Sequence, residues 1–297
     1  MFDDALAVAC DINYFPGCRA LINSVFTYHP ELPIFVFERG FTEREFSWCA
    51  THPAGIHVYS ISRFPFFCPG LWEAKQQVFA ECVGRARTVC LIDADIVLLS
   101  RLDDVFQHAK HGRIVAGCDA MNIYYDDSYA VYGLEMAGRS ADGLNSGLVC
   151  LDVQAHWDVV GLWAFSSNFA AYSPHGGYPL RLPGFGDQGL LNAIIVRLGK
   201  ESLCQLLPHG VWHDFRDPRK LRVVESAANG ALFVERIATG QRQRIIHSVG
   251  EKWWWQSDAV RDERFDYFRH FFELSFARED VKTLRNGAAA TPIARGI

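Results

Sequence analysis

Short apolar runs alternate with segments of helical periodicity through most of the chain. The apolar runs are rich in β-branched residues, as expected for strands that are covered on both faces. Segments that alternate in this way predict successive βα units around a mostly parallel sheet. We expect strands at 6–10, 34–37, 56–61, 88–92, 113–118 and 148–151. We expect helices at 17–28, 42–50, 73–83, 102–106 and 187–198.

Three segments lack this alternation. Residues 122–145 are rich in Tyr, Asp and Gly, and their length predicts a functional loop or lid. Residues 172–186 are dense in Pro and Gly, as expected of an irregular surface segment. Near the end of the chain, phenylalanines recur at helical spacing and are expected to pack on the core, at Phe265, Phe268, Phe272 and Phe276. We therefore predict one α/β domain over 1–255, followed by a helical extension and tail over 256–297.

The bulk composition narrows the class of protein. A net charge of −5 over 297 residues gives no basic excess, which argues against a nucleic-acid partner. The nine cysteines form no CxxC pair, so we expect reduced thiols rather than a zinc or redox site. The odd cysteine count, a start without a basic leader and the lack of a bilayer-length apolar run predict a cytoplasmic protein without a transmembrane segment.

The candidate chemistry begins where one of the apolar runs ends. Asp93-Ala94-Asp95 directly follows the expected strand 88–92, and ligands of open α/β sheets bind at the carboxyl ends of strands. Two crowded carboxylates repel each other, and a divalent cation relieves that repulsion while keeping positions for phosphate oxygens. The alternative is a strand that ends in a turn with two solvated aspartates. The motif alone does not decide between them.

Four further segments extend this motif to a pattern. They are Asp11-Ile12-Asn13-Tyr14, Asn145-Ser146-Gly147, Gly186 to Asn192 and His247 to Trp254. In this order and spacing, over about residues 5–255, the chain resembles the family 8 retaining glycosyltransferases, which include glycogenin and bacterial lipopolysaccharide galactosyltransferases. The resemblance implies a GT-A-like fold, in which helices flank a mostly parallel, Rossmann-like nucleotide-binding sheet. It also implies a hexosyltransferase that moves glucose or galactose from a UDP-sugar to an acceptor hydroxyl, with retention at the anomeric carbon.

The resemblance assigns a metal site. Asp93 and Asp95 would hold a divalent ion, and His247 would complete the set from a distant segment. Imidazole is a softer ligand than oxygen, so this mixed set favours Mn²⁺ over Mg²⁺. The ion would bridge the donor's diphosphate and neutralise the charge that develops as that group leaves. For His247 taken alone, a histidine satisfied at a strand end is the alternative.

The resemblance also assigns donor contacts. Asp11 and Asn13 would bond the base and ribose, and Tyr14 would stack on the uracil. Lys75 would reach the donor sugar and phosphate, while Gly250 and Lys252 would approach the phosphates. Asn145 and Ser146 would reach the hydroxyls of the transferred sugar, with Gly147 allowing close packing. The full donor-binding set is Asp11, Asn13, Tyr14, Lys75, Asp93, Ala94, Asp95, Asn145, Ser146, Gly250 and Lys252.

The catalytic candidates are Asp187 and Gln188, which the resemblance places beneath the anomeric carbon. Retention needs either a covalent intermediate on a carboxylate or attack by the acceptor from the face of the leaving group. Asp187 is the best-placed nucleophile, yet by analogy the same-face course is favoured. An aspartate at the start of an expected helix also has a purely structural interpretation, because it caps the helix or complements its dipole.

Some features depart from the family pattern or leave the function open. Trp253 stands where members commonly carry proline, which leaves the path of that loop open. Gly184 stands where glycogenin-like members often carry aspartate, so the donor sugar is not assigned. The tryptophans at 253–255 either line an acceptor site or anchor the loop. The acceptor would be a glycan, a lipid-linked glycan or a protein, and 122–145 and 174–185 are the candidate contacts.

Two other functional classes are compatible with parts of the pattern. Haloacid dehalogenase-type phosphatases also place Asp-x-Asp after an apolar strand, but near the start of the chain, and they leave the later motifs unexplained. A nucleotide-sugar-binding protein without turnover would keep the fold, yet loss of activity usually leaves some site positions altered, and here all are present.

Overall fold

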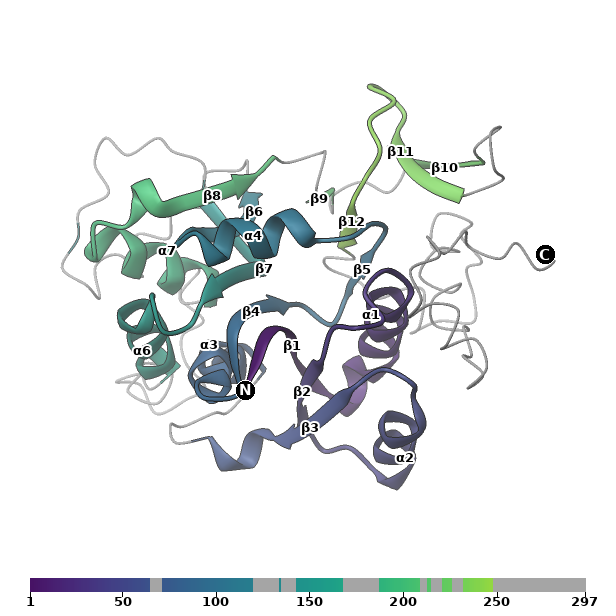
Figure 1. Ribbon diagram of the computed structural model, residues 1–297, viewed down its shortest axis with the longest axis horizontal. Helices are drawn as coiled ribbons and strands as arrows, with labels where there is room; N and C mark the ends of the chain where they lie inside the picture. The colour runs from purple at the N-terminus through teal and green to yellow at the C-terminus, as the bar shows by residue number, and fades with distance from the viewer. Residues whose placement is uncertain are drawn as a thin grey trace, which may run out of the picture.

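The computed structural model describes residues 1–64, 71–119, 134, 143–167, 187–208, 213–214, 221–225 and 232–247. A seven-stranded sheet in the order β3-β2-β1-β4-β7-β6-β8 forms its centre (Figure 1). Its strands are β1 (Phe2–Asp11), β2 (Ile34–Arg39), β3 (Ile56–Ser60), β4 (Ala86–Ile92), β6 (Ile114–Asp119), β7 (Gly143–Asp152) and β8 (Cys204–Leu207). Pairing is parallel except that β7 runs antiparallel to both neighbours, β4 and β6. The prediction of a mostly parallel sheet is confirmed.

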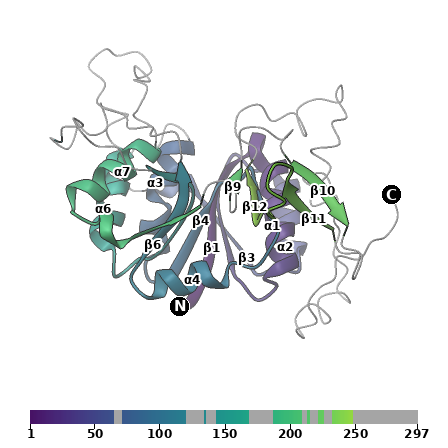
Figure 2. The same cartoon turned by 90° about the horizontal axis from the view of Figure 1, so that it is seen from above.

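Helices cover both faces of this sheet. Figure 2 shows α1 (Phe15–Tyr28) and α2 (Glu43–Thr51) on one side, and α3 (Leu71–Cys82), α6 (Trp157–Ser166) and α7 (Asp187–Arg197) on the other. The core accordingly has two halves, one on each face of the sheet. Leu6 and Val8 pack in the half that also holds α4 (Asp103–Lys110), whereas Ala5 and Ala7 pack against α3. This division follows from the strand geometry, because successive side chains point to opposite faces.

Two smaller sheets lie outside the predicted elements. β5 (Ile96–Leu98), β12 (Ile245–His247) and β9 (His213–Asp214) form a three-stranded sheet, and β10 (Leu221–Glu225) pairs with β11 (Leu232–Arg236) in a hairpin. β12 lies between β5 and β9 and brings His247 opposite Ile96. Strands of two or three residues show no hydrophobic period, so the sequence pattern does not reveal them.

One predicted boundary is wrong in a way that matters for the site. The expected loop 122–145 includes Gly143, Leu144 and Asn145, which instead begin β7 and pair with β6. The side chain of Asn192 fixes this end of the strand, since its amide oxygen accepts from Leu144 N at 2.8 Å and its amide nitrogen donates to Leu144 O at 2.9 Å. The expected strand 148–151 is therefore the second half of a longer strand. The rest of the loop apart from Leu134, the segment 172–186 and the extension 256–297 lie outside the described residues.

Two further findings concern the cysteines and the length of the helices. Eight of the nine cysteines lie in the described ranges, and all eight are free thiols, mostly buried. Among the helices that the structure describes, none has both the length and the apolar character needed to cross a membrane.

Candidate active site at the carboxyl end of the central sheet

Three strands deliver the candidate residues to one edge of the sheet. Asp11 ends β1, and Asp93 follows β4, which is parallel to β1. β7 runs the other way, so its first half, with Asn145 and Ser146, approaches the same edge. A backbone hydrogen bond of 2.9 Å from Asp93 N to Gly147 O joins the two segments. The topology thus brings motifs that are distant in sequence into one region.

The three predicted metal ligands come together. His247 Nε2 lies 3.1 Å from Asp95 Oδ1 and 3.8 Å from Asp93 Oδ2. The three residues can each offer a ligand atom, and these atoms all lie within 4.8 Å of one another. Asp95 and His247 are buried, and Asp93 is half-buried. Burial raises the pKa of Asp93, Lys75 opposes this rise, and Asp95 adds to it, so crowded carboxylates are present as the motif predicts.

Gly147 makes room for the imidazole of this set. A Cβ atom at this position would lie 2.5 Å from His247 Cε1 and 2.9 Å from His247 Nδ1. It would also lie 2.8 Å from Asn145 Oδ1, which accepts a hydrogen bond from Gly147 N. A side chain here would therefore displace the histidine, so Gly147 allows the close approach of His247.

A buried lysine connects the metal set to the catalytic candidates. Lys75 Nζ lies 2.7 Å from Asp93 Oδ1 and 2.8 Å from Asp187 Oδ2, and it donates to Ser146 Oγ at 3.1 Å. Burial alone lowers the pKa of Lys75, but Asp187 and Asp93 raise it above its ordinary value. The side chain is therefore a fixed cation. Lys75 is not a solvated charge on the helix surface, since it is only 6% exposed.

The start of α7 is fastened to β7 and α6. Ser146 Oγ donates to Asp187 Oδ2 at 2.7 Å, and Ser146 N donates to Gln188 Oε1 at 3.2 Å. Trp163 Nε1 donates to the backbone oxygen of Asp187 at 3.0 Å. Asp187 is therefore placed by specific contacts with Ser146, Lys75 and Trp163. The supporting role of Trp163 was not predicted, because nothing local in the sequence distinguishes it from a core residue. Asn192 belongs to the motif Gly186 to Asn192, but its contact with Leu144 was not predicted.

The β1–α1 connection places Tyr14 beside the acidic cluster. Asp11 Oδ1 accepts from Asn13 N at 2.9 Å and from Tyr14 N at 3.0 Å, which caps a short 3₁₀ helix at Ile12–Tyr14. Tyr14 is half-buried and packs against the core. Burial raises the pKa of Tyr14, and the carboxylates of Asp95, Asp11 and Asp93 raise it further. Tyr14 thus packs on the core within the electrostatic influence of these carboxylates.

Some of the remaining candidate residues lie in the described part of the chain and the others lie outside it. Ala94 is buried in the core between the two aspartates of the motif, and Asn13 is exposed. Gly250, Lys252 and the tryptophans 253–255 lie outside the described residues, as does Gly184.

Comparisons with known proteins agree with this architecture. No protein-family model and no curated protein matches the chain. The apo structure of the bifunctional glycosyltransferase WbbM aligns with a TM-score of 0.62 at 14% identity, over 95% of this chain and 52% of WbbM. This chain therefore spans about half the length of WbbM.

Two further solved structures have the same fold. The galactosyltransferase LgtC, in complex with donor and acceptor sugar analogs, aligns with a TM-score of 0.57 at 14% identity, over 95% of this chain and 99% of LgtC. The glycosyltransferase GlyE of Streptococcus pneumoniae aligns with a TM-score of 0.56 at 13% identity, over 100% of this chain and 67% of GlyE. At such identities these likenesses establish the GT-A-like fold.

Proposed function

We propose that this chain is a metal-dependent retaining glycosyltransferase of the family 8 type, which transfers a hexose from a UDP-sugar to an acceptor hydroxyl. The placement of Asp93 carries the proposal. Its Oδ1 atom lies 2.7 Å from Lys75 Nζ, and its Oδ2 atom lies 3.8 Å from His247 Nε2. One carboxylate thus links a cation-binding set to a buried lysine that reaches Asp187. Fold likeness to proteins described as glycosyltransferases supports the same conclusion.

The protein ligands of the cation site fit Mn²⁺. Two carboxylates and one imidazole, from Asp93, Asp95 and His247, combine hard and borderline ligands, and three protein ligands would leave positions for donor oxygens. When bound, the ion would supply Lewis-acid stabilisation of the diphosphate as it leaves.

Lys75 and Asp187 provide fixed charges of opposite sign beside that site. In the proposed reaction, the cation of Lys75 attracts the donor's phosphate or sugar oxygens. The carboxylate of Asp187 stabilises the positive charge that develops at the anomeric carbon as the leaving group departs. Asn145 and Ser146 would bond sugar hydroxyls, and Gln188 would position the sugar through its amide.

The contacts of Asp187 favour retention by same-face attack. Its Oδ2 atom accepts from Ser146 Oγ and lies 2.8 Å from Lys75 Nζ. Both contacts stabilise the negative charge of the carboxylate and so make it a weaker nucleophile. In the proposed step, the acceptor oxygen bonds to the anomeric carbon as the bond to the diphosphate oxygen breaks. The acceptor proton passes to that diphosphate oxygen. An active-site glutamine-to-glutamate variant is described for LgtC, and Gln188 is our candidate for a comparable position.

The nucleotide would lie over the β1–α1 connection. Tyr14 would stack on the uracil, with Asp11 and Asn13 beside the ribose and base. The oxygen Oδ1 of Asp11 already caps the 3₁₀ helix, so its contribution to the nucleotide would come from its other oxygen. Gly250 and Lys252 are proposed phosphate contacts. The acceptor would be a glycan, a lipid-linked glycan or a protein.

A turnover assay tests this function against its alternatives. The purified protein is incubated with Mn²⁺ and UDP-glucose or UDP-galactose, and release of UDP is measured beside Asp187→Asn and a control, Asp158→Asn. Asp158 also pairs with a lysine, at 2.6 Å from Lys200 Nζ, but on the outer helix α6. We expect UDP release by the wild type and the control, and about a hundred-fold loss in Asp187→Asn, on the scale of one transition-state contact.

The other outcomes separate the alternatives. Donor binding without UDP release would support a binding protein without turnover. Hydrolysis of a simple phosphate monoester, with no requirement for a nucleotide sugar, would support a phosphatase.

A further inference from the structure

β12, a strand of only three residues, places His247 beside Asp93 and Asp95. It pairs antiparallel with β5, in the register Ile245↔Leu98, Ile246↔Val97 and His247↔Ile96. Strands in proteins are usually about five or six residues long, so three pairs give little cooperative support to the last residue. The position of His247 therefore depends on what holds the strand beyond its pairing.

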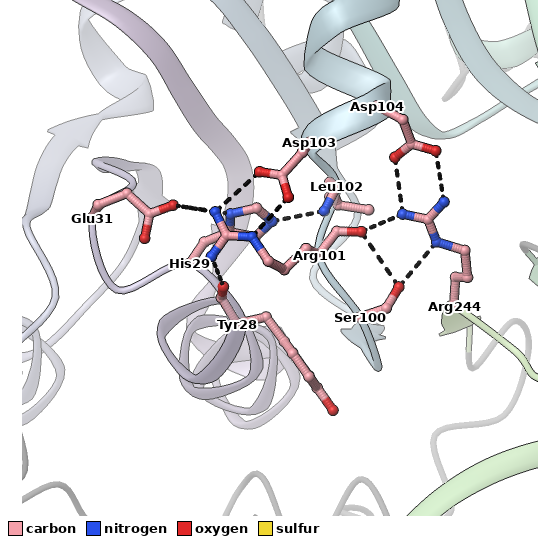
Figure 3. Close-up of polar contacts among 9 residues, drawn as sticks. All are labelled: Tyr28, His29, Glu31, Ser100, Arg101, Leu102, Asp103, Asp104 and Arg244. Carbon is pink, nitrogen blue, oxygen red and sulfur yellow. Dashed lines mark hydrogen bonds and ion pairs between the residues drawn. The ribbon is translucent and has the colours of Figure 1, made fainter. Parts of the chain in front are cut away.

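Arg244 fastens the chain immediately before β12. Its guanidinium donates through Nη1 to Asp104 Oδ2 at 2.7 Å and through Nη2 to Asp104 Oδ1 at 2.9 Å (Figure 3). Its Nε donates to Ser100 Oγ at 3.0 Å, and Nη2 also donates to the backbone oxygen of Arg101. The backbone oxygen of Arg244 accepts from Leu99 N at 2.8 Å. Side chain and main chain thus bind one short segment, which runs from Leu99 after β5 to Asp104 in the first turn of α4.

That segment is itself fixed from the opposite side. The Arg101 guanidinium donates to Tyr28 O at 2.6 Å and to Glu31 Oε1 at 2.7 Å, at the end of α1. Leu102 N donates to His29 Nε2 at 2.7 Å (Figure 3). The segment that binds Arg244 is therefore attached to the end of α1. Because the segment begins directly after β5, which follows Asp93 and Asp95, Arg244 connects the strand of His247 to the chain of the two aspartates.

The small contribution of the Arg244–Asp104 pair to stability favours a role in positioning the chain. The side chains of Arg244 and Asp104 are 26% and 49% exposed, and ion pairs at such positions add little to the stability of a fold. A bidentate arginine–carboxylate pair nevertheless fixes the relative orientation of the two segments that it joins. We propose that Arg244 is a positioning residue that holds β12 so that His247 stays within reach of Asp95. This inference rests on the proposed function, which assigns His247 to the metal set.

Metal affinity tests the inference directly. Mn²⁺ is titrated calorimetrically into the wild type, Arg244→Gln, Arg244→Lys and a control, Arg87→Gln. Arg87 is exposed and pairs with the buried carboxylate of Asp152 at 2.8 Å, near the opposite end of β4. We expect about a ten-fold loss of Mn²⁺ affinity in Arg244→Gln, a smaller loss in Arg244→Lys and none in the control, on the scale known for groups that orient metal ligands.

A double-mutant cycle distinguishes positioning from general support of the fold. If Arg244 acts through His247, then Arg244→Gln changes Mn²⁺ affinity by less than about two-fold in a His247→Ala background. An equal ten-fold loss in both backgrounds would overturn the inference. Saturating Mn²⁺ should also restore the kcat of Arg244→Gln.

The remaining outcomes are distinct. If Arg244→Gln does not fold, Asp104→Asn replaces it, since this variant removes the charge pair and keeps the bonds to Ser100 and Arg101; an affinity equal to that of the wild type would then overturn the inference. Mn²⁺ binding by the wild type with unchanged affinity in Arg244→Gln would overturn the inference alone. A wild type that does not bind Mn²⁺ would overturn the proposed metal site as well.

Discussion

The ammonium group of Lys75 lies 2.8 Å from a carboxylate oxygen of Asp187, in a contact that joins α3 to the first residue of α7. Lys75 also neutralises Asp93, so its removal would leave two carboxylates without their shared cation. We expect Lys75→Met to reduce the free energy of unfolding by about 3–5 kcal/mol, as for other broken buried ion pairs. Urea unfolding measures this loss.

A second lysine provides the control for that measurement. Lys200 pairs with Asp158 at 2.6 Å, where Asp158 is 48% exposed. Lys200→Met should cost about 1 kcal/mol or less, because water screens the pair. Equal losses in the two variants would contradict the special role of the buried lysine.

Gly147→Ala tests the close approach of His247. The new Cβ would lie 2.5 Å from His247 Cε1, so the imidazole must move. We expect about a ten-fold loss of Mn²⁺ affinity and a destabilisation of about 1–3 kcal/mol. Gly161→Ala is the control, because its Cβ would meet nothing nearer than Trp157 at 3.9 Å, in a helix that favours alanine. Unchanged metal affinity in Gly147→Ala would remove His247 from the site.

Tyr14→Ala tests the proposed nucleotide platform. If uracil stacks on this ring, the variant should bind UDP more weakly by about 1 kcal/mol or more, on the scale of a lost base stack. Tyr14→Phe keeps the ring without the hydroxyl and should bind UDP as the wild type does. Calorimetric affinities of the three proteins decide the matter, and equal values for wild type and Tyr14→Ala would exclude stacking.

His52 predicts an acid-sensitive stability. Its Nε2 lies 2.8 Å from Asn23 Oδ1, and its Nδ1 accepts from Ala54 N at 3.1 Å, an arrangement that suits the neutral ring. Burial, with a contribution from Arg19, lowers the pKa of His52 from 6.5 to about 4. Between these values the unfolded chain binds the proton more tightly, so the stability present above pH 6.5 is lost as the pH falls towards 4.

Melting temperatures at pH 7 and pH 5 measure this effect. The drop on acidification should be smaller in His52→Gln than in the wild type. His111→Gln, at an exposed position after α4, should show the same drop as the wild type. A His52→Gln protein with an undiminished drop would show that other groups cause the acid sensitivity.

The sequence predicts six of the seven strands of the central sheet, because these are long enough to show a hydrophobic pattern. The four-residue strand β8 was not predicted. The sequence does not predict β12, whose three residues have no period and whose partner β5 lies far back in the chain. Asp93 and Asp95 were identifiable because they follow a buried strand directly. The contact of Lys75 with Asp187 could not be identified from the sequence, because spacing gives no information on how two helices that cover the same face of a sheet meet. The start of β7 was mistaken for loop because polar residues, Asn145 and Ser146, interrupt the apolar pattern there.

Calorimetric titration of UDP is the most direct test of a metal-dependent nucleotide-sugar site. The wild type is titrated with Mn²⁺ present and again with the metal chelated, and Asp95→Asn is titrated with Mn²⁺. We predict UDP binding by the wild type with Mn²⁺, and a large loss of affinity both on chelation and in a folded Asp95→Asn. Binding that is equal in all three, or absent from the wild type in both conditions, would contradict the account.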